Sequence, residues 1–540
     1  MPSIAKRIAK KLVAEIIDNA PHVIVQAKAG SGKTTTIIEG LKCLLGHPVT
    51  IKPSPQQQAV WEAMSLSKGT AKSICFVAFN KSIATELQNR VPQGVEAMTM
   101  HSMGLRAITK TLGRFEINNF VVQDIIADLL KTNTKDLRKN KPTLLSTTDD
   151  LVGLCKMNLL EGTIDECISL CNHHNIELNG SASEVYDLVP KVLERCKDPK
   201  ANGNKINFDD MIWLPVILNL PITKYDLLLV DEVQDLNTCQ QQLAIRAGKR
   251  LILVGDVRQA IYGFAGADAE SMKNLSVQLS NICQETDTRL PTRGCIEIPL
   301  TVTRRCGKRI VAEANHFVAD FQAHETCCEG SVSSANYPIR KVGERTEELP
   351  YEQTYLPLVQ DGDMVLCRTN APLVNQCFKF LRLGRKANIQ GRDIGKGLIA
   401  LVKKTKAETV RDLLERLADW LSSETTKEQC KSNPCETRIQ GFQDRYDCLC
   451  CFCSDLATSA SVEKIIAKIE SVFTDDKQNP GIKFSSIHKA KGLESRRVFF
   501  LKPPMSGPRR DKMRDWEIEQ EDNLSYVAIT RAIEELIYVR

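Results

Sequence analysis

The sequence has no hydrophobic run long enough to cross a membrane and no secretory leader. No apolar stretch in its 540 residues approaches the roughly 18 residues that a transmembrane helix needs. It also contains no internal repeat and no low-complexity tract. These absences argue against membrane, secreted and repeat proteins. They predict a soluble, intracellular protein without a membrane partner.

The composition excludes little else. With 42% hydrophobic and 26% charged residues, the chain resembles an ordinary globular protein, and its length predicts several domains. The net charge of +6 permits a nucleic-acid partner without arguing for one. Any nucleic-acid surface would therefore be a local basic groove.

Cysteine is abundant but scattered. Twenty cysteines in a chain without a secretory leader indicate thiols in a reducing compartment. One group is dense, because CKSNPC (430–435) and CLCCFC (448–453) place six cysteines within 24 residues. Four of them could bind zinc or an iron–sulfur cluster, although two clean Cys-x₂-Cys pairs are missing. Buried cysteines that act as small hydrophobic residues are the alternative.

Short apolar runs that end in polar residues predict two series of buried parallel strands. The intervening stretches, 105–204 and 398–478, show helical periods instead. The expected fold class is α/β, with two parallel-sheet domains that each carry a mainly helical insertion. The predicted strands are 23–27, 74–79, 226–232 and 250–256 in the first domain, and 364–368, 482–487, 497–501 and 535–539 in the second.

A glycine-rich segment, AKAGSGKTTTI (27–37), lies between the first predicted strand and a predicted helix. This context is typical of a phosphate-binding loop, in which backbone N–H groups and the helix dipole bind phosphate. Lys33 would bind the β- and γ-phosphates, and the Thr34 hydroxyl would bind Mg²⁺. Ala27 departs from the general pattern, which has glycine there.

Two acids follow the predicted strand LLLV. Asp231 and Glu232 would complete the site, because one carboxylate can hold the metal and the other can orient or deprotonate the attacking water. We assign the metal to Asp231 together with Thr34. The sequence thus predicts a Mg²⁺-dependent nucleoside triphosphatase.

Eight segments occur in a characteristic order. They are AKAGSGKT (27–34), VAFNKSIATEL (77–87), TMHSMG (99–104), VDEVQD (230–235), GDVRQAIYGFAGAD (255–268), LTVTRRCGKRI (300–310), SSIHKAKGLES (485–495) and EDNLSYVAITRA (521–532). This set resembles the ordered motifs of superfamily 1A DNA helicases of the UvrD, Rep and PcrA type, where the alanine at position 27 is usual. The resemblance implies two RecA-like domains with ATP in the cleft between them.

The resemblance also implies a domain organisation. The expected parts are the first part of core 1 (1–104), a helical insertion (105–204), the second part of core 1 (205–290), the first part of core 2 (291–397), a reduced, cysteine-rich helical insertion (398–478) and the second part of core 2 (479–540).

The resemblance assigns further residues to the nucleotide. Gln259 would sense the γ-phosphate, and Arg305 and Arg531 would reach it from the second domain, where fixed cations stabilise the transferring phosphoryl group. The expected cofactors are ATP and Mg²⁺. The expected nucleotide-binding residues are Ala27, Lys28, Ala29, Gly30, Ser31, Gly32, Lys33, Thr34, Thr35, Gly492 and Glu494.

A second set matches family positions along the DNA strand. Tyr262 and Phe264 would stack on bases or hold the base pocket, a contact that tolerates any sequence. For any one of these residues, a core aromatic or a capped polar turn is the alternative. The others in this set are Phe79, Asn80, Thr99, His101, His488 and Lys489.

The implied function is an ATP-dependent 3′ to 5′ DNA helicase or single-stranded DNA translocase that acts on tailed duplexes in DNA repair, recombination or replication. The insertions could bind protein partners. Alternatives are a DNA-dependent ATPase that strips proteins or remodels strands, a catalytically inactive DNA scaffold, and a motor on RNA.

Three departures from the family pattern bear on this function. The only glutamine upstream of the phosphate loop is Gln26, inside the predicted strand, and the segment resembling the adenine-reading element, PSPQQQAVWEAM (53–64), lies downstream of the loop. Ala265 stands where the family has arginine. The small insertion at 398–478 favours translocation over robust unwinding.

Overall fold

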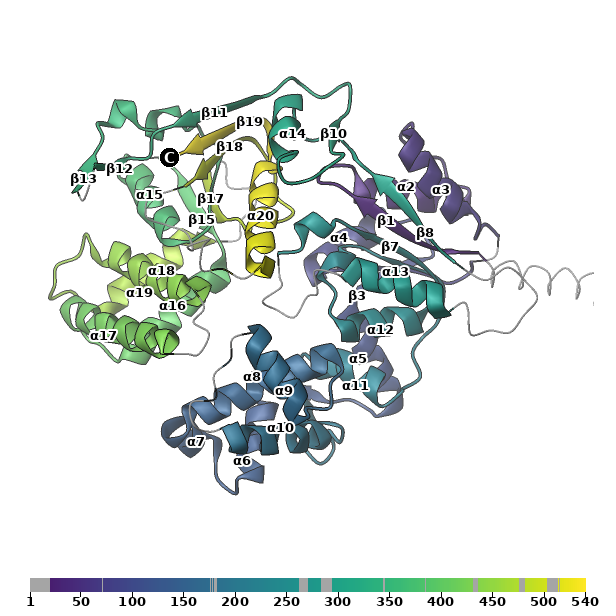
Figure 1. Ribbon diagram of the computed structural model, residues 1–540, viewed down its shortest axis with the longest axis horizontal. Coiled ribbons are helices and arrows are strands. Elements are labelled where there is room, and N and C mark those ends of the chain that lie inside the picture. The colour runs from purple at the N-terminus through teal and green to yellow at the C-terminus, as the bar shows by residue number, and fades with distance from the viewer. Residues whose placement is uncertain are drawn as a thin grey trace, which may run out of the picture. The chain divides into compact units, whose positions relative to one another are not determined.

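The computed structural model consists of two compact units, Met1–Thr301 (unit 1) and Val302–Arg540 (unit 2), each built on a parallel β-sheet (Figure 1). The expected fold class is confirmed. The residues that the structure describes are 20–69, 71–174, 176, 178, 182–261, 271–282, 294–342, 345–383, 385–430, 436–474, 481–502, 513 and 515–540.

Unit 1 contains a six-stranded sheet in the order β3-β2-β6-β7-β1-β8, and all its strand pairs are parallel. Each inner strand is a run of buried aliphatic residues, as expected where both faces of a sheet are covered. The strands are β1 (His22–Ala27), β2 (Ile74–Ala78), β3 (Val95–Thr99), β6 (Tyr225–Val230), β7 (Gly248–Gly255) and β8 (Cys295–Leu300).

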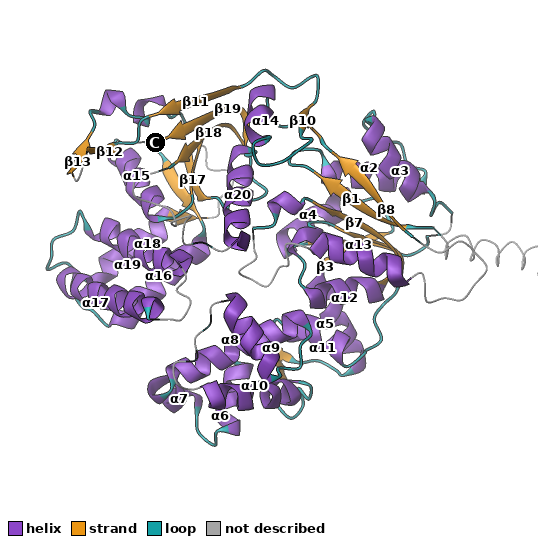
Figure 2. Cartoon of the chain, viewed as in Figure 1, coloured by secondary structure: helices purple, strands orange, loops and turns teal. Residues whose placement is uncertain are grey.

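Helices cover both faces of this sheet (Figure 2). Alternate residues of β1 separate the two layers, because Val23 and Val25 pack against α2 to α4 whereas Ile24 packs in the core that contains α5 and α11 to α13. The elements are α2 (Lys33–Leu45), α3 (Pro55–Ser65), α4 (Lys81–Arg90), α5 (Met100–Thr111), α11 (Asp210–Ile217), η1 (Val233–Asp235), α12 (Thr238–Ala247), η2 (Val257–Gln259) and α13 (Ser271–Ile282).

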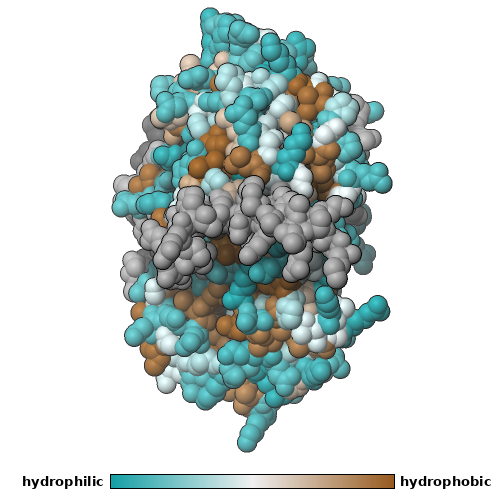
Figure 3. Space-filling model, turned by 90° about the vertical axis from the view of Figure 1, so that its right-hand side faces the viewer, coloured by the Kyte–Doolittle hydropathy of each residue, from teal (hydrophilic) through white to brown (hydrophobic). Residues whose placement is uncertain are grey.

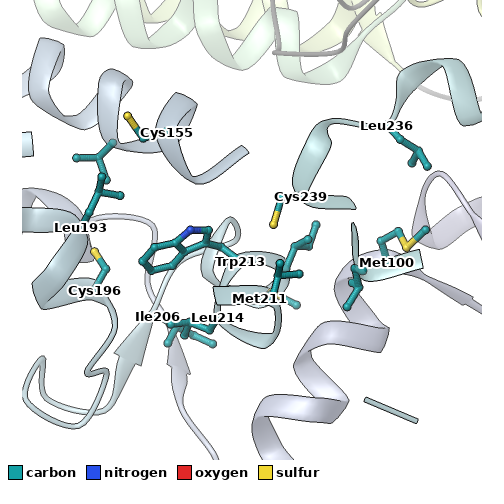
Figure 4. Packing of buried hydrophobic residues seen from close by; sticks show 14 of the residues in the cluster. Met100, Cys155, Leu193, Cys196, Ile206, Met211, Trp213, Leu214, Leu236 and Cys239 are labelled. Atoms are coloured by element: carbon teal, nitrogen blue, oxygen red, sulfur yellow. The ribbon is translucent and has the colours of Figure 1, made fainter. Parts of the chain in front are cut away.

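The helical insertion of unit 1 shares its core with the second of these layers. Trp213 of α11 packs among residues of the insertion and of the sheet-covering helices (Figure 4). Beside it, the Lys156 ammonium and the Asp210 carboxylate form a buried ion pair at 2.7 Å. The elements are β4 (Glu116–Ile117), α6 (Val121–Leu129), α7 (Thr134–Asn140), α8 (Pro142–Asn158), α9 (Ile164–His174), α10 (Ala182–Cys196) and β5 (Lys205–Ile206), with β4 parallel to β5.

Unit 2 contains a seven-stranded parallel sheet in the order β11-β19-β18-β14-β17-β15-β16. Its main strands are again continuous apolar runs. The strands are β11 (Ser331–Ala335), β14 (Met364–Cys367), β15 (Ala387–Gln390), β16 (Phe473–Thr474), β17 (Ile482–Ser486), β18 (Ser495–Leu501) and β19 (Ala532–Val539).

Helices α15 to α19 pack on this sheet as one group, and α14 and α20 contact its strand β19. The helices α15 to α19 share one hydrophobic core with the sheet, and within this group α16 to α19 form the insertion. The other elements of unit 2 include a two-stranded antiparallel ribbon, β12 with β13. The elements are β9 (Val302–Thr303), α14 (Lys308–Ala314), β10 (Gln322–Ala323), β12 (Ile339–Val342), β13 (Arg345–Glu348), η4 (Tyr351–Gln353), η5 (Leu356–Leu358), α15 (Ala371–Arg382), α16 (Arg392–Thr405), α17 (Val410–Gln429), α18 (Glu436–Cys453), α19 (Val462–Val472) and α20 (Asp515–Ile529).

All eight predicted strands are present, but the predicted boundaries between parts need correction. The division between the cores lies after Thr301 and not after residue 290, because β8 pairs with β1 in the sheet of unit 1. The expected borders at 104/105 and 397/398 fall inside α5 and α16, which are continuous helices.

The dense cysteine group lies mainly on α18. Cys448 and Cys453 are buried in the hydrophobic core of unit 2, while Cys435 lies outside the described residues. Within the part of the chain that the structure describes, no group of three or more His, Cys, Asp or Glu side chains is placed to hold a metal ion. Packing as small hydrophobic residues accounts for the buried cysteines of α18.

Exposed hydrophobic residues are interspersed with hydrophilic ones on the face of the molecule shown in Figure 3. Among the described residues, no helix combines the length and the apolar character that spanning a bilayer requires.

The packing of α5 on α11 depends on Gly104. A Cβ atom at this position would lie 1.9 Å from the Met211 carbonyl oxygen, so the two helices must separate to admit it. We expect Gly104→Ala to lower the unfolding free energy by about 1–3 kcal/mol or more. Gly153→Ala in α8 is the matched control, since its nearest neighbour is 3.6 Å away. Chemical denaturation measures both, and equal stability of the two variants would contradict the packing argument.

Candidate functional site

The phosphate loop has the predicted setting of strand, loop and helix. β1 ends at Ala27, and α2 begins at Lys33. Gly30 and Gly32 adopt positive φ angles of 67° and 79°, a conformation that favours glycine. Among the described residues, no side chain caps the N-terminus of α2, so its backbone N–H groups face the loop as an anion site. The loop therefore has the backbone form that phosphate binding requires.

The structure brings the two acids after β6 to this loop. The Lys33 Nζ atom lies 2.9 Å from Glu232 Oε1, and the Thr34 hydroxyl donates to Asp231 Oδ2 at 3.2 Å. Thr34 and Asp231 thus place two hard oxygen ligands side by side, as Mg²⁺ prefers. Ser31 Oγ is buried in the same loop without a hydrogen-bond partner among the described residues, which fits a site for a phosphate oxygen.

The charges in this site depend on one another. Burial alone would lower the pKa of Lys33, but the carboxylates of Glu232, Asp231 and Asp256 raise it well above its ordinary value. Burial and the neighbouring Glu232 carboxylate raise the pKa of Asp231, Lys33 opposes the rise, and the net value is about 6. Lys33 is therefore a fixed cation, and the ionised Asp231 carboxylate is costly until another cation accompanies it.

Glu232 has a strained backbone. Its φ of 54° and ψ of 43° lie in the left-handed region, which is rare for a residue other than glycine, asparagine or aspartate. The Glu232 N–H donates to Asp231 Oδ1 at 2.9 Å. The strained turn thus directs two consecutive carboxylates to the same loop.

Gln259 lies in η2, directly after β7. Its Nε2 donates to Asp256 Oδ2 at 2.7 Å, and both side chains are buried. Burial raises the pKa of Asp256, and Lys33 lowers it. The predicted phosphate sensor is therefore held in unit 1 by an acid that also acts on the phosphate-loop lysine.

The two predicted arginines lie together in unit 2. Arg305 forms an ion pair with Glu494 at 2.5 Å, and its Nη1 donates to the Thr530 carbonyl at 3.4 Å. Arg531 is buried and donates to the carbonyls of Val527 and Leu493 and to the Thr530 hydroxyl. Gly492, with a φ of 83°, turns the chain just before Glu494. The structure thus gathers all four predicted nucleotide residues of this unit.

The predicted DNA residues of unit 1 follow the carboxyl ends of β2 and β3. Phe79 is 46% exposed, whereas the side chains of Asn80 and Thr99 accept backbone hydrogen bonds as the N-caps of α4 and α5. Capping, the alternative given by the sequence, accounts for these two. The His101 ring meets the edge of Phe208 at 5.5 Å between centroids, and burial lowers the pKa of His101.

Phe208 is an aromatic residue that the sequence analysis missed. It is 50% exposed and lies beside a predicted DNA residue, although the two are far apart in the chain. An exposed aromatic ring beside strand ends is suited to stacking on a base. The available signal was an aromatic residue directly before the acidic pair of NFDDM (207–211).

In unit 2, His488 and Lys489 follow β17. Burial, together with the nearby charges of Arg368 and Lys491, lowers the pKa of His488 to about 3. His488 is therefore neutral at physiological pH and could act on a nucleic acid only through neutral contacts. Tyr262, Phe264 and Ala265 lie outside the described residues.

The downstream glutamine segment forms α3, which begins with a capping box of Ser54 and Gln57. The Gln57 Nε2 atom donates to the Thr36 hydroxyl at 2.9 Å, so α3 lies against the helix that follows the phosphate loop. Gln26 instead donates to Glu297 of β8. The segment therefore lies downstream of the phosphate loop in sequence, where the family has it upstream. In space it nevertheless contacts the helix that begins at the loop.

Two family models match the chain. The model described as the UvrD/REP helicase N-terminal domain matches residues 10–280, and the model described as the UvrD-like helicase C-terminal domain matches residues 229–539.

Three curated relatives show the extent of the similarity. The ATP-dependent DNA helicase PcrA of Bacillus subtilis is 22% identical over 629 residues, which cover 95% of this chain and 80% of PcrA. The ATP-dependent DNA helicase Rep of Buchnera aphidicola is 28% identical over 288 residues, which cover 49% of this chain and 40% of Rep. The F-box DNA helicase protein 1 of Schizosaccharomyces pombe is 23% identical over 560 residues, which cover 98% of this chain and 56% of that protein. The chain thus spans less than two thirds of two of these relatives.

The raised pKa of Asp231 gives a prediction on stability. In the metal-free protein, the protonated Asp231 side chain favours the folded state fully below about pH 4. This stabilisation is lost as the pH rises through about 6, because the folded state must then bury an ionised carboxylate. We expect Asp231→Asn to raise Tm at pH 7.5, by about 2–4 °C for each kcal/mol gained. The same variant should lose the further rise that Mg²⁺ and ATP give to the wild type.

Asp226 at the start of the same strand is the matched control. Burial would raise its pKa, but Lys249 and the N–H and hydroxyl groups of Ser73 hold it at about 2. Asp226→Asn should therefore lower Tm at pH 7.5. Thermal unfolding at pH 7.5 and pH 5 measures both variants, and a lower Tm for Asp231→Asn at pH 7.5 would refute the electrostatic argument.

Proposed function

We propose that this chain, which belongs to the UvrD/Rep helicase family, hydrolyses ATP to move 3′ to 5′ along single-stranded DNA and to unwind duplex ahead of it. The observation that carries the proposal is the convergence of Lys33, Thr34, Asp231 and Glu232 within hydrogen-bonding distance. These residues come from two segments almost 200 positions apart in sequence, the start of α2 and the turn after β6. Such a motor would serve DNA repair, recombination or replication.

The chemistry in unit 1 follows from the exchange of one partner. Lys33 pairs with Glu232 in the structure. Bound phosphates would attract Lys33 as well, so its charge would be shared between the phosphates and Glu232. The Glu232 carboxylate can thereby orient the attacking water and accept its proton. Thr34 and Asp231 would hold Mg²⁺, whose charge stabilises the phosphate oxygens and makes the ionised form of Asp231 favourable.

Arg305 and Arg531 would supply the second set of charges. An arginine binds phosphate oxygens through two parallel hydrogen bonds, and such a residue contributes strongly to phosphoryl transfer. Because Arg305 is paired with Glu494, a phosphate must compete with that carboxylate. The proposal requires both sets of residues to act on the same nucleotide.

The DNA strand would pass the aromatic residues that follow the strand ends of unit 1. Phe79 is exposed, and Phe208 adds a second exposed ring beside His101. Stacking on such rings does not depend on base identity, which suits movement along any sequence.

A second candidate function is a DNA-dependent ATPase that displaces proteins or remodels strands without processive unwinding. The observation that favours it is the size of the unit 2 insertion, which consists of α16 to α19 alone among the described residues. This candidate uses the same nucleotide residues and differs only in what the movement achieves.

The nucleotide site can be tested by substitution. Lys33→Ala and Arg531→Ala should each abolish DNA-stimulated ATP turnover, with losses on the order of 10³-fold for the arginine. Arg531→Lys keeps the charge but not the two parallel hydrogen bonds of a guanidinium group, so its ATP turnover should also be impaired. It serves as the test variant if Arg531→Ala folds poorly. Arg496→Ala is the control, since that side chain is 76% exposed and pairs with Glu534 at the surface. Strong DNA-stimulated turnover in the Lys33 or Arg531 variants would disprove the site.

The direction of movement can be tested with tailed duplexes. Unwinding of a duplex with a 3′ single-stranded tail, and none of one with a 5′ tail, is the expected result, with Lys33→Ala as the inactive control. Unwinding from the 5′ tail alone would contradict the proposed direction. Brisk DNA-stimulated ATP turnover without unwinding of either duplex would favour the second candidate function.

A further inference from the structure

Gln234 is a buried glutamine whose amide is used at both ends. It lies in η1, two residues after Glu232, and is only 1% exposed. Its Nε2 donates to Glu232 Oε2, and its Oε1 accepts from the Asp256 N–H at 3.0 Å. A carboxylate needs a donor and an N–H needs an acceptor, so the two partners determine which way the amide points.

The fit of this amide explains a glycine at the end of β7. A Cβ atom at Gly255 would lie 2.5 Å from Gln234 Oε1 and 2.9 Å from the Met272 sulfur. Any larger residue at this position would have to displace the Gln234 side chain. The amide is therefore confined by packing as well as by its two hydrogen bonds.

The contacts continue from Asp256 to Gln259. One oxygen of the Asp256 carboxylate accepts from Gln259 Nε2 at 2.7 Å, and the other accepts from the Arg258 N–H at 3.1 Å. Glu232, Gln234, Asp256 and Gln259 are thus joined in series, from the end of β6 to the turn after β7. The path connects the acid assigned to water activation with the residue assigned to the γ-phosphate.

We propose that Gln234 is a positioning residue that couples Glu232 to Gln259. The inference rests on the proposed function and goes beyond it, since Gln234 need not contact the nucleotide. When phosphates attract Lys33, the hydrogen bond from Gln234 continues to hold the Glu232 carboxylate in place. A displacement of that carboxylate also reaches the backbone of Asp256, and from there the turn that carries Gln259 and precedes Tyr262.

The chemistry of the amide makes glutamine the suitable residue at this position. A methionine of similar size would leave Glu232 Oε2 and the Asp256 N–H without these partners in a buried place. A glutamate would keep the acceptor for the N–H but would set a second carboxylate against Glu232. Both substitutions preserve volume, so they test the hydrogen bonds rather than the packing.

The test uses the full chain with Gln234→Met. We expect kcat for ATP in the presence of oligo-dT to fall about 10- to 100-fold, because a misplaced base forfeits part of the roughly 10²- to 10⁴-fold that a positioned base contributes. KM for ATP should stay within about twofold, because the phosphate loop is unchanged. The ratio of DNA-stimulated to basal turnover should also fall.

A double-mutant cycle with Gln259→Ala tests the coupling directly. If the two residues act through one path, the double variant should lose little more than the more damaging single variant. Fold losses that multiply in the double variant would overturn the proposal, because they would show two independent effects.

Gln241→Met is the matched control. Gln241 is buried in the same unit and donates to the Leu236 carbonyl at 3.2 Å, outside the nucleotide site. It should lower Tm comparably while the stimulation ratio stays at the wild-type value. A fall in that ratio equal to that of Gln234→Met would show a general effect of destabilisation and overturn the positioning role.

The outcomes separate this inference from the proposed function. Absence of DNA-stimulated ATP turnover in the wild type would refute the proposed function itself. A wild-type stimulation ratio in folded Gln234→Met would refute only the role of Gln234. If that variant does not fold, Gln234→Glu is measured in the same assays, with the same loss expected, and a wild-type ratio there would refute the role equally.

Discussion

The ion pair between Lys33 and Glu232 is the contact on which the nucleotide site of unit 1 depends. The two residues follow β1 and β6, which are separated in the sheet by β7, so the pair spans the end of an intervening strand. The intervening strand, β7, ends in Gly255, where any side chain would collide with Gln234. Without a nucleotide, the pair keeps a buried lysine and a strained glutamate in compensating positions, because an unaccompanied buried charge is costly.

Unit 2 also pairs a cation of its candidate nucleotide site with a carboxylate, but this ion pair is more exposed to solvent. Arg305 is held by Glu494, whose side chain is half exposed, whereas both members of the Lys33–Glu232 pair are largely shielded from solvent. Exposed ion pairs contribute only about 0–1 kcal/mol, so Arg305 can leave its partner at little cost. Arg531 is held differently, by carbonyl groups in a buried setting. The two arginines therefore differ in setting: Arg305 pairs with a half-exposed carboxylate, whereas Arg531 is buried and held by groups of its own unit.

The sequence allowed the prediction of those parts whose signal is local. Continuous apolar runs identified eight strands, and the glycine loop and the acid pair identified the residues that meet in unit 1. β8 was missed because it is an edge strand with exposed positions, including Glu297, and its polar pattern does not resemble a buried strand. The roles of Phe208 and Gln234 depend on partners that are distant in sequence, His101 for Phe208 and the Asp256 N–H for Gln234. Hydrophobic periodicity along the chain cannot predict such contacts. Asn80 and Thr99 cap α4 and α5, which is the alternative that the sequence offered, and their role at DNA stays a prediction.

Each helical insertion is tied to its sheet-bearing core by a buried carboxylate. In unit 1, Asp210 binds Lys156 of α8 and stands two residues after Phe208. In unit 2, Asp444 of α18 accepts hydrogen bonds from the backbone N–H groups of Asn370 and Ala371, at the start of the helix that follows β14. Breaking a buried pair such as Lys156–Asp210 costs about 3–5 kcal/mol, so the insertion of unit 1 cannot swing freely at this point. Each insertion is therefore fixed to its core at a defined element, at the start of α11 in unit 1 and at the start of α15 in unit 2.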